Sequence, residues 1–171
     1  MWYVMQVISG QENRAVLLIE KLAEEGMLER CFVPMRRLKK KFHGEWSEVT
    51  EKIFPGYVFL ITSQPVLLYE ELKKVPILTR ILGRSGEYFT PLAEAEVQMM
   101  EKLNGKGAEA GLSTIAVEEG SQIRILSGPL INLEGQIRKV NLHKRIAEVE
   151  MEFMGNRTVV HLGIEIVKKK E

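Results

Sequence analysis

The residues of this sequence that could do chemistry are its cations and aromatics, because its nucleophiles and metal ligands are isolated. The single cysteine, Cys31, lies in an apolar run with no neighbouring base, as is typical of a core thiol. The histidines are His43, His143 and His161, and their separations fit no metal-ligand spacing. Every acidic residue is Glu, so Walker B and EF-hand sites built on Asp are excluded. With no P-loop, nucleophile elbow or zinc signature, we expect no catalytic residue, metal or cofactor, and no enzyme.

One run of the sequence concentrates positive charge. Segment 36–41 carries five cations in six residues, interrupted only by Leu38. Such a cluster suits phosphate contact and predicts binding that weakens as salt rises. His43 and Trp46 follow it and offer ring faces on which a base could stack. The alternative is a solvated hairpin. The cations are Arg36, Arg37, Lys39, Lys40 and Lys41.

The elements that must position these residues alternate between strand and helix signals as far as residue 103. Ser9-Gly10-Gln11-Glu12 has the pattern of a capping box, and apolar residues at helical spacing follow it. Thr90-Pro91 is predicted to open another helix, because threonine caps and proline suits the first helical position. The predicted strands are 2–8, 30–35, 56–61 and 77–82, with a hairpin turning near His43-Gly44 and a helix at 65–74. This order predicts an α+β fold whose N-terminal domain has a split βαβ, ferredoxin-like sheet.

The sequence changes character after residue 103. Residues 104–117 contain Gly105, Gly107 and Gly111 and break all periodicity, which predicts a flexible linker. From 118 to 171, short alternating runs separated by glycine turns predict a small SH3-like β-barrel. The predicted domains are therefore 1–103 and 118–171, joined by the linker 104–117.

The bulk composition limits the class of protein. An apolar content of 45% and a charged content of 27% over 171 residues are typical of a soluble globular chain. No apolar run approaches the roughly 20 residues needed to cross a bilayer, so no membrane partner is expected. The net charge of +1 means that any nucleic-acid binding must come from local clusters. A lone cysteine suits a reducing, cytoplasmic setting, and nothing demands more than a monomer.

Two motifs, one in each predicted domain, carry a family resemblance. Phe54-Pro55-Gly56-Tyr57-Val58-Phe59 looks like the signature strand of the N-terminal domain of the NusG family, and Trp2-Tyr3-Val4 matches that domain's opening motif. Segments 119–125, 128–130 and 134–137 resemble a KOW motif. The sequence thus resembles NusG-family transcription elongation factors over nearly its whole length, with the two motifs in the right order.

The resemblance implies partners for the first domain. In the family this strand lines an apolar pocket that grips the clamp helices of the largest RNA polymerase subunit, and aromatic anchors suit such helix binding. The alternative is that Phe54 and Tyr57 are simply core residues. The polymerase-binding positions implied by the resemblance are Trp2, Tyr3, Phe54, Pro55 and Tyr57. The basic run 36–41 corresponds to a loop that can touch non-template DNA.

The second domain is expected to bind a further partner. Three Glu residues on one face of 147–153 would repel phosphate, so an RNA surface should lie elsewhere. A basic turn at 139–145 resembles LoaP-type antiterminators, in which the KOW domain is implicated in recognising a leader RNA hairpin. The alternative for these cations is ordinary solubilising charge. The RNA-contact candidates are Arg124, Arg138, Lys139, His143, Lys144, Arg145 and Arg157.

Other functions remain open at this point. A general elongation factor would use its KOW domain to bind a termination factor or a ribosomal protein. A stand-alone KOW RNA-binding protein would need no polymerase contact. Ferredoxin-like folds also include small phosphatases, but the sequence has no loop in which Arg and Asn converge as a phosphate cradle.

Overall fold

The computed structural model describes residues 1–74, 89–105 and 107–167, without the side chain of Ser121. The predicted strand 77–82 lies outside these residues. The chain forms two compact units. The first combines Met1–Pro34 with Phe54–Val97, and the second combines Met35–Ile53 with Gln98–Glu171. The basic hairpin therefore belongs to the same unit as the C-terminal strands, whereas the sequence predicts it in the first domain.

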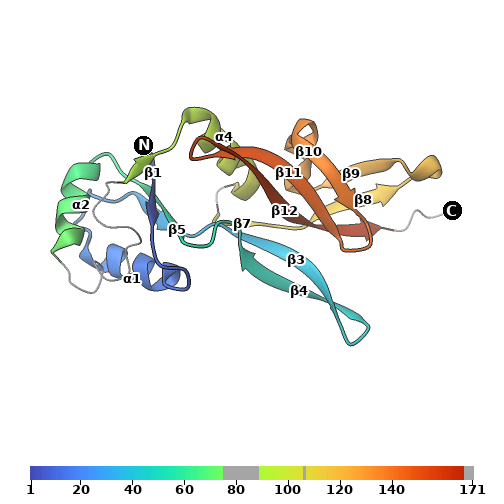
Figure 1. Ribbon diagram of the computed structural model, residues 1–171, viewed down its shortest axis with the longest axis horizontal. Helices are drawn as coiled ribbons and strands as arrows, with labels where there is room; N and C mark the ends of the chain where they lie inside the picture. The colour runs from blue at the N-terminus through green and yellow to red at the C-terminus, as the bar shows by residue number, and fades with distance from the viewer. Residues whose placement is uncertain (75–88, 106, 168–171) are drawn as a thin grey trace. The chain divides into compact units, whose positions relative to one another are not determined.

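The first unit is a four-stranded antiparallel sheet with helices against one face (Figure 1). Its strand order is β2-β5-β1-β6, so the strand predicted to be central, β5, indeed has a neighbour on each side. Together with a second unit rich in strands, this sheet confirms the predicted α+β fold. The elements are β1 (Trp2–Gln6), α1 (Glu12–Leu22), β2 (Arg30–Phe32), β5 (Tyr57–Ile61), α2 (Pro65–Lys73) and β6 (Thr90–Pro91).

Helix α1 follows its predicted apolar stripe but forms only part of its predicted capping box. Ala15 and Ile19 are fully buried on one side of the helix, as their spacing predicts. The Glu12 carboxylate accepts a hydrogen bond from the Gly10 amide. The N-cap residue, Gln11, contributes no side-chain hydrogen bond. Glu12 therefore makes its part of the capping box, but no side chain caps the helix at the N-cap position.

The helix predicted to open at Thr90-Pro91 begins later, at α4 (Glu94–Asn104). Thr90-Pro91 instead forms β6, which pairs with the outer edge of β1. Proline is tolerated there because an edge strand does not need every amide hydrogen. The turn into α4 is held by the Glu96 carboxylate, which accepts a hydrogen bond of 3.1 Å from the Ala93 amide. Pairing with β1 therefore outweighs the local helix-start signal.

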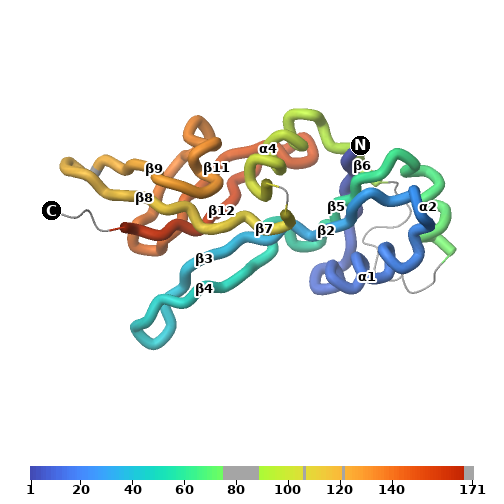
Figure 2. Tube along the Cα trace, turned by 180° about the vertical axis from the view of Figure 1, so that it is seen from behind, coloured from blue at the N-terminus to red at the C-terminus, as the bar shows by residue number. Residues whose placement is uncertain are grey.

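The second unit contains two sheets. A three-stranded sheet has the order β4-β3-β7, and a five-stranded sheet has the order β10-β11-β12-β8-β9. Strand β3 lies beside β12 in both views (Figures 1 and 2). The strands are β3 (Met35–Phe42), β4 (Glu45–Lys52), β7 (Glu109–Ala110), β8 (Ser113–Val117), β9 (Ile123–Ser127), β10 (Ile137–Asn141), β11 (Ile146–Phe153) and β12 (Asn156–Val167).

The predicted linker 104–117 is wrong over much of its length. Strand β7 pairs in parallel with β3, and β8 pairs in parallel with β12 and antiparallel with β9. The residues of β8 are Ser113–Val117, so the C-terminal sheet begins before residue 118. The glycines of this stretch concealed its strand character, because β7 and β8 are held by backbone hydrogen bonds to strands far along the chain. Local periodicity does not indicate such distant pairing partners.

The hairpin of β11 and β12 confirms the alternation of the sequence. Ala147, Val149, Met151 and Phe153 of β11 are buried, and the three Glu side chains lie on the opposite face. The two strands pair from Ile146–Gly163 to Phe153–Asn156. Gly163 allows β12 to approach β3 closely, because a Cβ there would lie 3.0 Å from Leu38 Cα and collide with the Arg37 carbonyl oxygen. The absence of a side chain at Gly163 thus allows the basic hairpin to pack closely on the five-stranded sheet.

Candidate functional site

A row of aromatic rings crosses one face of the first unit's sheet. Trp2 meets Phe32 edge-on at 5.6 Å between ring centroids, Phe32 lies 5.6 Å from Phe59, and Phe59 stacks on Phe54 at 5.8 Å. The register places Trp2, Phe32 and Phe59 on the same face, because Phe59 pairs with Phe32 on one side and with Val4 on the other. We call these four residues the aromatic row. Phe32, Phe59 and Phe54 are buried, so the row offers an apolar contact surface only at its Trp2 end.

The opposite face of this sheet carries the helices. Tyr3 lies on that face and contacts Phe89 at 6.4 Å, and Phe89 in turn meets Tyr69 of α2 edge-on at 5.4 Å. Cys31 also lies there and is buried, as predicted for a core thiol. Burial raises the pKa of the Cys31 thiol to about 12, and the charge of Glu20 on α1 adds to the effect. Such a thiol stays protonated and unreactive at neutral pH.

The structure separates the five residues predicted to bind polymerase. Trp2 and Tyr57 are half-buried and Pro55 is exposed, so all three present surface in the folded chain. Tyr3 and Phe54 are buried, and only 5% of Phe54 is exposed. Phe54 therefore presents little surface to a partner, since its ring packs on Phe59 within the core. The alternative from the sequence, that Phe54 is a core residue, agrees with this geometry.

The motif around Phe54 also forms a turn before its strand. The Tyr57 amide donates a hydrogen bond of 3.3 Å to the Phe54 carbonyl, and Gly56 has a positive φ of 87°. A positive φ at the third position of such a turn requires glycine, and proline suits the second position. The Gly56 carbonyl then accepts a hydrogen bond of 2.8 Å from Val7. Pro55 and Gly56 thus set where β5 begins.

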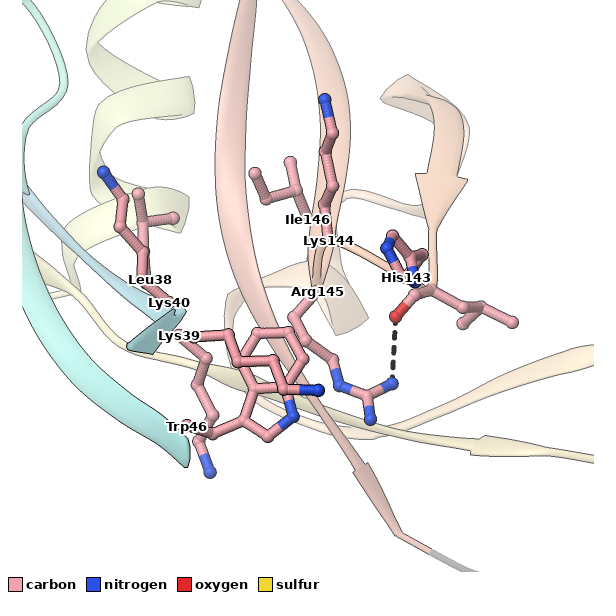
Figure 3. Close-up of a pocket in the computed structure, with 10 residues that line it drawn as sticks. Leu38, Lys39, Lys40, Trp46, His143, Lys144, Arg145 and Ile146 are labelled. Carbon is pink, nitrogen blue, oxygen red and sulfur yellow. Dashed lines mark hydrogen bonds between the residues drawn. The ribbon is translucent and has the colours of Figure 1, made fainter. Parts of the chain in front are cut away.

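A second candidate surface is a cavity of about 770 Å³ in the second unit (Figure 3). It joins the hairpin of β3 and β4 to the turn between β10 and β11. We call it the Trp46 pocket. Its side chains are aliphatic, aromatic or basic, and none of these described residues is acidic. The lining residues are Leu38, Lys39, Lys40, Lys41, Trp46, Leu142, His143, Lys144, Arg145 and Ile146.

The turn between β10 and β11 holds Arg145 against the indole of Trp46. The Arg145 guanidinium carbon lies 5.1 Å from the Trp46 ring centroid, and one of its nitrogens donates a hydrogen bond of 2.9 Å to the Leu142 carbonyl (Figure 3). Arg145 has a φ of 59°, which is uncommon for a residue other than glycine. Its carbonyl accepts a hydrogen bond of 3.0 Å from Ile164. The turn is therefore tied to β12, and the arginine is held in place.

Most of the cations predicted to contact DNA are paired with carboxylates. Arg36 and Lys40 share Glu51, Arg37 meets Glu48 and Glu109, and Lys39 meets Glu165. The hydrogen bond from Lys40 holds the pKa of the Glu51 carboxyl below its ordinary value, and the charges of Lys40 and Arg36 act in the same direction. Among the described residues, Lys41 is the one cation of this run without a carboxylate within 4.0 Å. It lies 5.9 Å from the Trp46 ring instead.

The RNA-contact candidates fall into separate places. Arg138 and Arg157 both pair with Glu150 on the Glu face of β11, at 3.3 and 2.6 Å. Arg124 pairs with Glu118 at 3.7 Å. Lys139 lies exposed on β10, opposite Glu148. His143, Lys144 and Arg145 line the Trp46 pocket. Candidate residues on both sides of this pocket could be identified from the sequence. That they meet could not, because no local pattern links residues 41 and 145.

Two kinds of site are missing from the described part of the chain. No group of three or more His, Cys, Asp or Glu side chains could hold a metal ion among these residues. None of the described helices is long and apolar enough to cross a membrane.

Comparisons with known proteins agree on one family. The family model described as transcription termination factor nusG matches residues 1–101. The protein named transcription termination/antitermination protein NusG in Helicobacter pylori is 26% identical over 174 residues, which cover 98% of this chain and 97% of that protein. Its namesake in Thermus thermophilus is 28% identical over 180 residues, with coverage of 98% and 97%.

A solved structure supports the fold. Thermotoga maritima NusG, in a structure that concerns its domain interaction, aligns with a TM-score of 0.54 over 95% of this chain and 92% of its own. The two sequences are 23% identical, so this likeness speaks for the fold alone.

Proposed function

The chain belongs to the NusG family of transcription termination and antitermination factors, and from that premise we propose that it binds RNA polymerase through its N-terminal unit. The proposed partner is the pair of clamp helices of the largest polymerase subunit, and the proposed binding surface is formed by Trp2, at the end of the aromatic row, together with Pro55 and Tyr57. A protein that prefers the elongating conformation of polymerase disfavours its paused and terminating conformations. The relatives are transcription factors, which fits a protein without catalytic activity.

The aromatic row carries this part of the proposal. Trp2 and Tyr57 are half-buried at opposite ends of two paired strands, and Pro55 is exposed beside Tyr57. Half-buried aromatic rings with a rigid apolar backing are favourable anchors for a helix. Phe54 and Tyr3 act behind this surface, because both are buried in the core.

The C-terminal strands serve a second partner in this proposal. We favour a leader RNA hairpin, as in the LoaP-type antiterminators, because uncompensated cations gather at the turn between β10 and β11. Holding RNA next to polymerase raises its effective concentration there. The proposed modules are the first unit, Met1–Pro34 with Phe54–Val97, for polymerase and the second unit, Met35–Ile53 with Gln98–Glu171, for the second partner.

Two points of this proposal have alternatives. The general elongation factor of the family would use the same strands for a termination factor or a ribosomal protein. The contact of Arg36–Lys41 with non-template DNA has less support than before, because four of these five cations are ion-paired. We propose a monomer that needs polymerase and RNA as its partners.

Single-round transcription by the cognate polymerase through an intrinsic terminator tests the proposal. Templates with and without the native leader would be compared, using the wild type, Tyr57→Ala and Leu17→Ala. Tyr57 lies on the proposed surface, whereas Leu17 is an exposed apolar residue of α1 and so gives a matched control. We expect leader-dependent readthrough that Tyr57→Ala reduces about tenfold and Leu17→Ala leaves unchanged.

Each outcome of this assay has a meaning. Readthrough without the leader would favour the general elongation factor. Equal losses in both variants would remove the aromatic surface from the proposal. The absence of polymerase binding by the wild type would contradict the proposed function itself.

A further inference from the structure

The Trp46 pocket combines an aromatic face with positive charge that no carboxylate neutralises. Lys41 and Arg145 lie 5.9 and 5.1 Å from the centroid of the Trp46 ring, and Lys144 lines the same cavity. Among the described residues, no carboxylate lies within 4.0 Å of these three cations. Unpaired cations gathered in one place attract an anion from outside the protein.

The other two lysines of the pocket behave differently. Lys39 pairs with Glu165 at 2.7 Å, and Lys40 pairs with Glu51. Their charges are therefore neutralised within the unit. The two lysines contribute to the wall of the pocket more than to its electrostatic potential. The excess charge is concentrated at Lys41 and Arg145, which lie beside the indole, and at Lys144, which lines another part of the cavity (Figure 3).

The turn is built before any ligand arrives. The Lys144 amide donates a hydrogen bond of 3.0 Å to the Asn141 side chain, and the backbone and guanidinium of Arg145 are each held by a hydrogen bond. A guanidinium that is already fixed loses little conformational entropy when it binds a phosphate or stacks on a base. Trp46 remains 38% exposed, so part of its ring is open to a ligand.

We propose that the Trp46 pocket binds one unpaired nucleotide of a single-stranded nucleic acid. The base stacks on the indole of Trp46 or on the guanidinium plane of Arg145, and the flanking phosphates meet Lys41 and Lys144. Bases stack on aromatic rings and on arginine planes, whereas bases inside a duplex are already stacked and cannot enter. A cavity of about 770 Å³ is within the usual size of a ligand site.

This inference deepens the proposed function, since it names the place where the RNA-binding unit would take a nucleotide. It also changes that proposal, because Lys41 of the β3–β4 hairpin and the cations of the turn between β10 and β11 form one site for a single nucleic-acid strand. RNA and DNA both offer an unpaired base between phosphates, so the experiment includes a strand of each. An acidic peptide would satisfy the cations but would leave the indole face unused.

The test measures binding by the full-length protein in the absence of polymerase. Trp2→Phe leaves Trp46 as the one emitting tryptophan, since the chain has two. This protein would be titrated with ten-nucleotide oligouridylate and oligothymidylate, a ten-base-pair duplex and polyglutamate, and Trp46 emission would be followed. We expect quenching by a single strand, with the tighter strand identifying RNA or DNA as the source, and weak or no quenching by the duplex.

Variants assign the binding to individual groups. With labelled oligonucleotides, Trp46→Ala should raise the Kd about tenfold, whereas Trp46→Phe should raise it less than about threefold because a ring remains. Replacing Lys41 and Lys144 together by Ala should reduce the slope of log Kd against log salt by about 1.4, at about 0.7 for each phosphate contact of a single strand. Lys102→Ala, an exposed cation of α4 outside the pocket, should leave both quantities within about twofold of wild type.

Several results would overturn the inference. Binding of a labelled strand without any change in Trp46 emission would place the site elsewhere. Equal binding of the duplex would show a non-specific cationic surface. Displacement of the strand by polyglutamate at matched charge would show a site for acidic protein. Loss of polymerase binding in Tyr57→Ala with unchanged oligonucleotide binding would leave this inference standing, because the two proposals use different surfaces and different assays.

Discussion

The two tryptophans of this chain lie in opposite chemical surroundings. Trp2 belongs to a row of aromatic rings, and its nearest ring, Phe32, meets it edge-on at 5.6 Å. Trp46 has two cations above its ring, Lys41 at 5.9 Å and Arg145 at 5.1 Å. The first site offers an apolar contact for a helix, and the second offers stacking beside phosphate charge. In the two proposals, the same type of side chain therefore serves two different ligand classes.

The difference arises from what the neighbouring strands supply. Across β1 and β5 the partners of Trp2 and its neighbours are apolar residues such as Ile61 and Phe59. Directly opposite Trp46 on β3 is Lys41, and the turn between β10 and β11 adds Arg145. A residue type is thus an incomplete guide to function, because cross-strand neighbours determine the field around it.

The largest expected effect separates core from surface. Phe54→Ala should lower the free energy of unfolding by about 3–5 kcal/mol, because it removes a buried ring that stacks on Phe59. Trp46→Ala should change it by less than about 1 kcal/mol, because its ring is partly exposed. Urea denaturation followed by circular dichroism measures both values. Equal destabilisation by the two variants would remove the contrast between the two aromatic sites.

A smaller effect is expected where the Trp46 pocket meets the five-stranded sheet. Gly163→Ala should cost about 1–3 kcal/mol, because its Cβ would lie 2.6 Å from Leu112 Cδ2 and collide with the backbone of β3. The variant should also shift the emission of Trp46, measured with Trp2→Phe, and leave that of Trp2 unchanged. Gly135→Ala is the control, since nothing lies within 4 Å of its Cβ. Equal stability of the two variants would contradict the close packing of β12 on β3.

Quenching by ions sharpens the electrostatic side of the comparison. Iodide should quench Trp46 about two to three times more effectively than Trp2, because the cations of the pocket concentrate anions near the indole. The comparison uses Trp2→Phe and Trp46→Phe as single-emitter proteins. Caesium should show the opposite order, and 1 M salt should reduce both differences because the Debye length falls to about 3 Å. The same order for iodide and caesium would indicate exposure rather than charge.

The smallest expected effect concerns the ion pairs that neutralise β3. Glu51→Gln should cost less than about 1 kcal/mol at pH 7, because the pair with Lys40 is near the surface. Folding lowers the pKa of Glu51, so its contribution is present above the ordinary carboxyl pKa and disappears as pH falls through the lowered value. The stability difference between variant and wild type should therefore vanish at acidic pH. A difference that grows on acidification would contradict the assigned cause.

Much of the fold could be predicted from local patterns. The alternation of 147–153 correctly indicated a half-buried strand, and the apolar run 56–61 correctly indicated a central one. Three predictions depended on distant partners and were wrong. Thr90-Pro91 joins an edge of the sheet, part of 104–117 forms two strands, and the basic hairpin belongs with the C-terminal unit. Backbone pairing across long stretches of chain leaves no periodic signal.

The candidate sites divide in the same way. The family motifs pointed to the region that carries the proposed polymerase surface, but they did not distinguish buried Phe54 from half-buried Tyr57, because both lie in one short aromatic motif. The basic run 36–41 was recognised as a cluster of charge. Its neutralisation by Glu51, Glu109 and Glu165 could not be predicted, since two of these residues come from distant strands.

By itself, the sequence determined the family, the α+β character, the lack of Asp-based chemistry and the residues available for binding. Those properties depend on residue identity and local spacing, which are present before folding. Only the tertiary structure decided that Phe54 is core, that most cations of β3 are neutralised, and that Trp46 meets Arg145. These outcomes depend on burial and on charges brought together across the chain, because desolvation and Coulomb energies act between neighbours in space rather than in sequence.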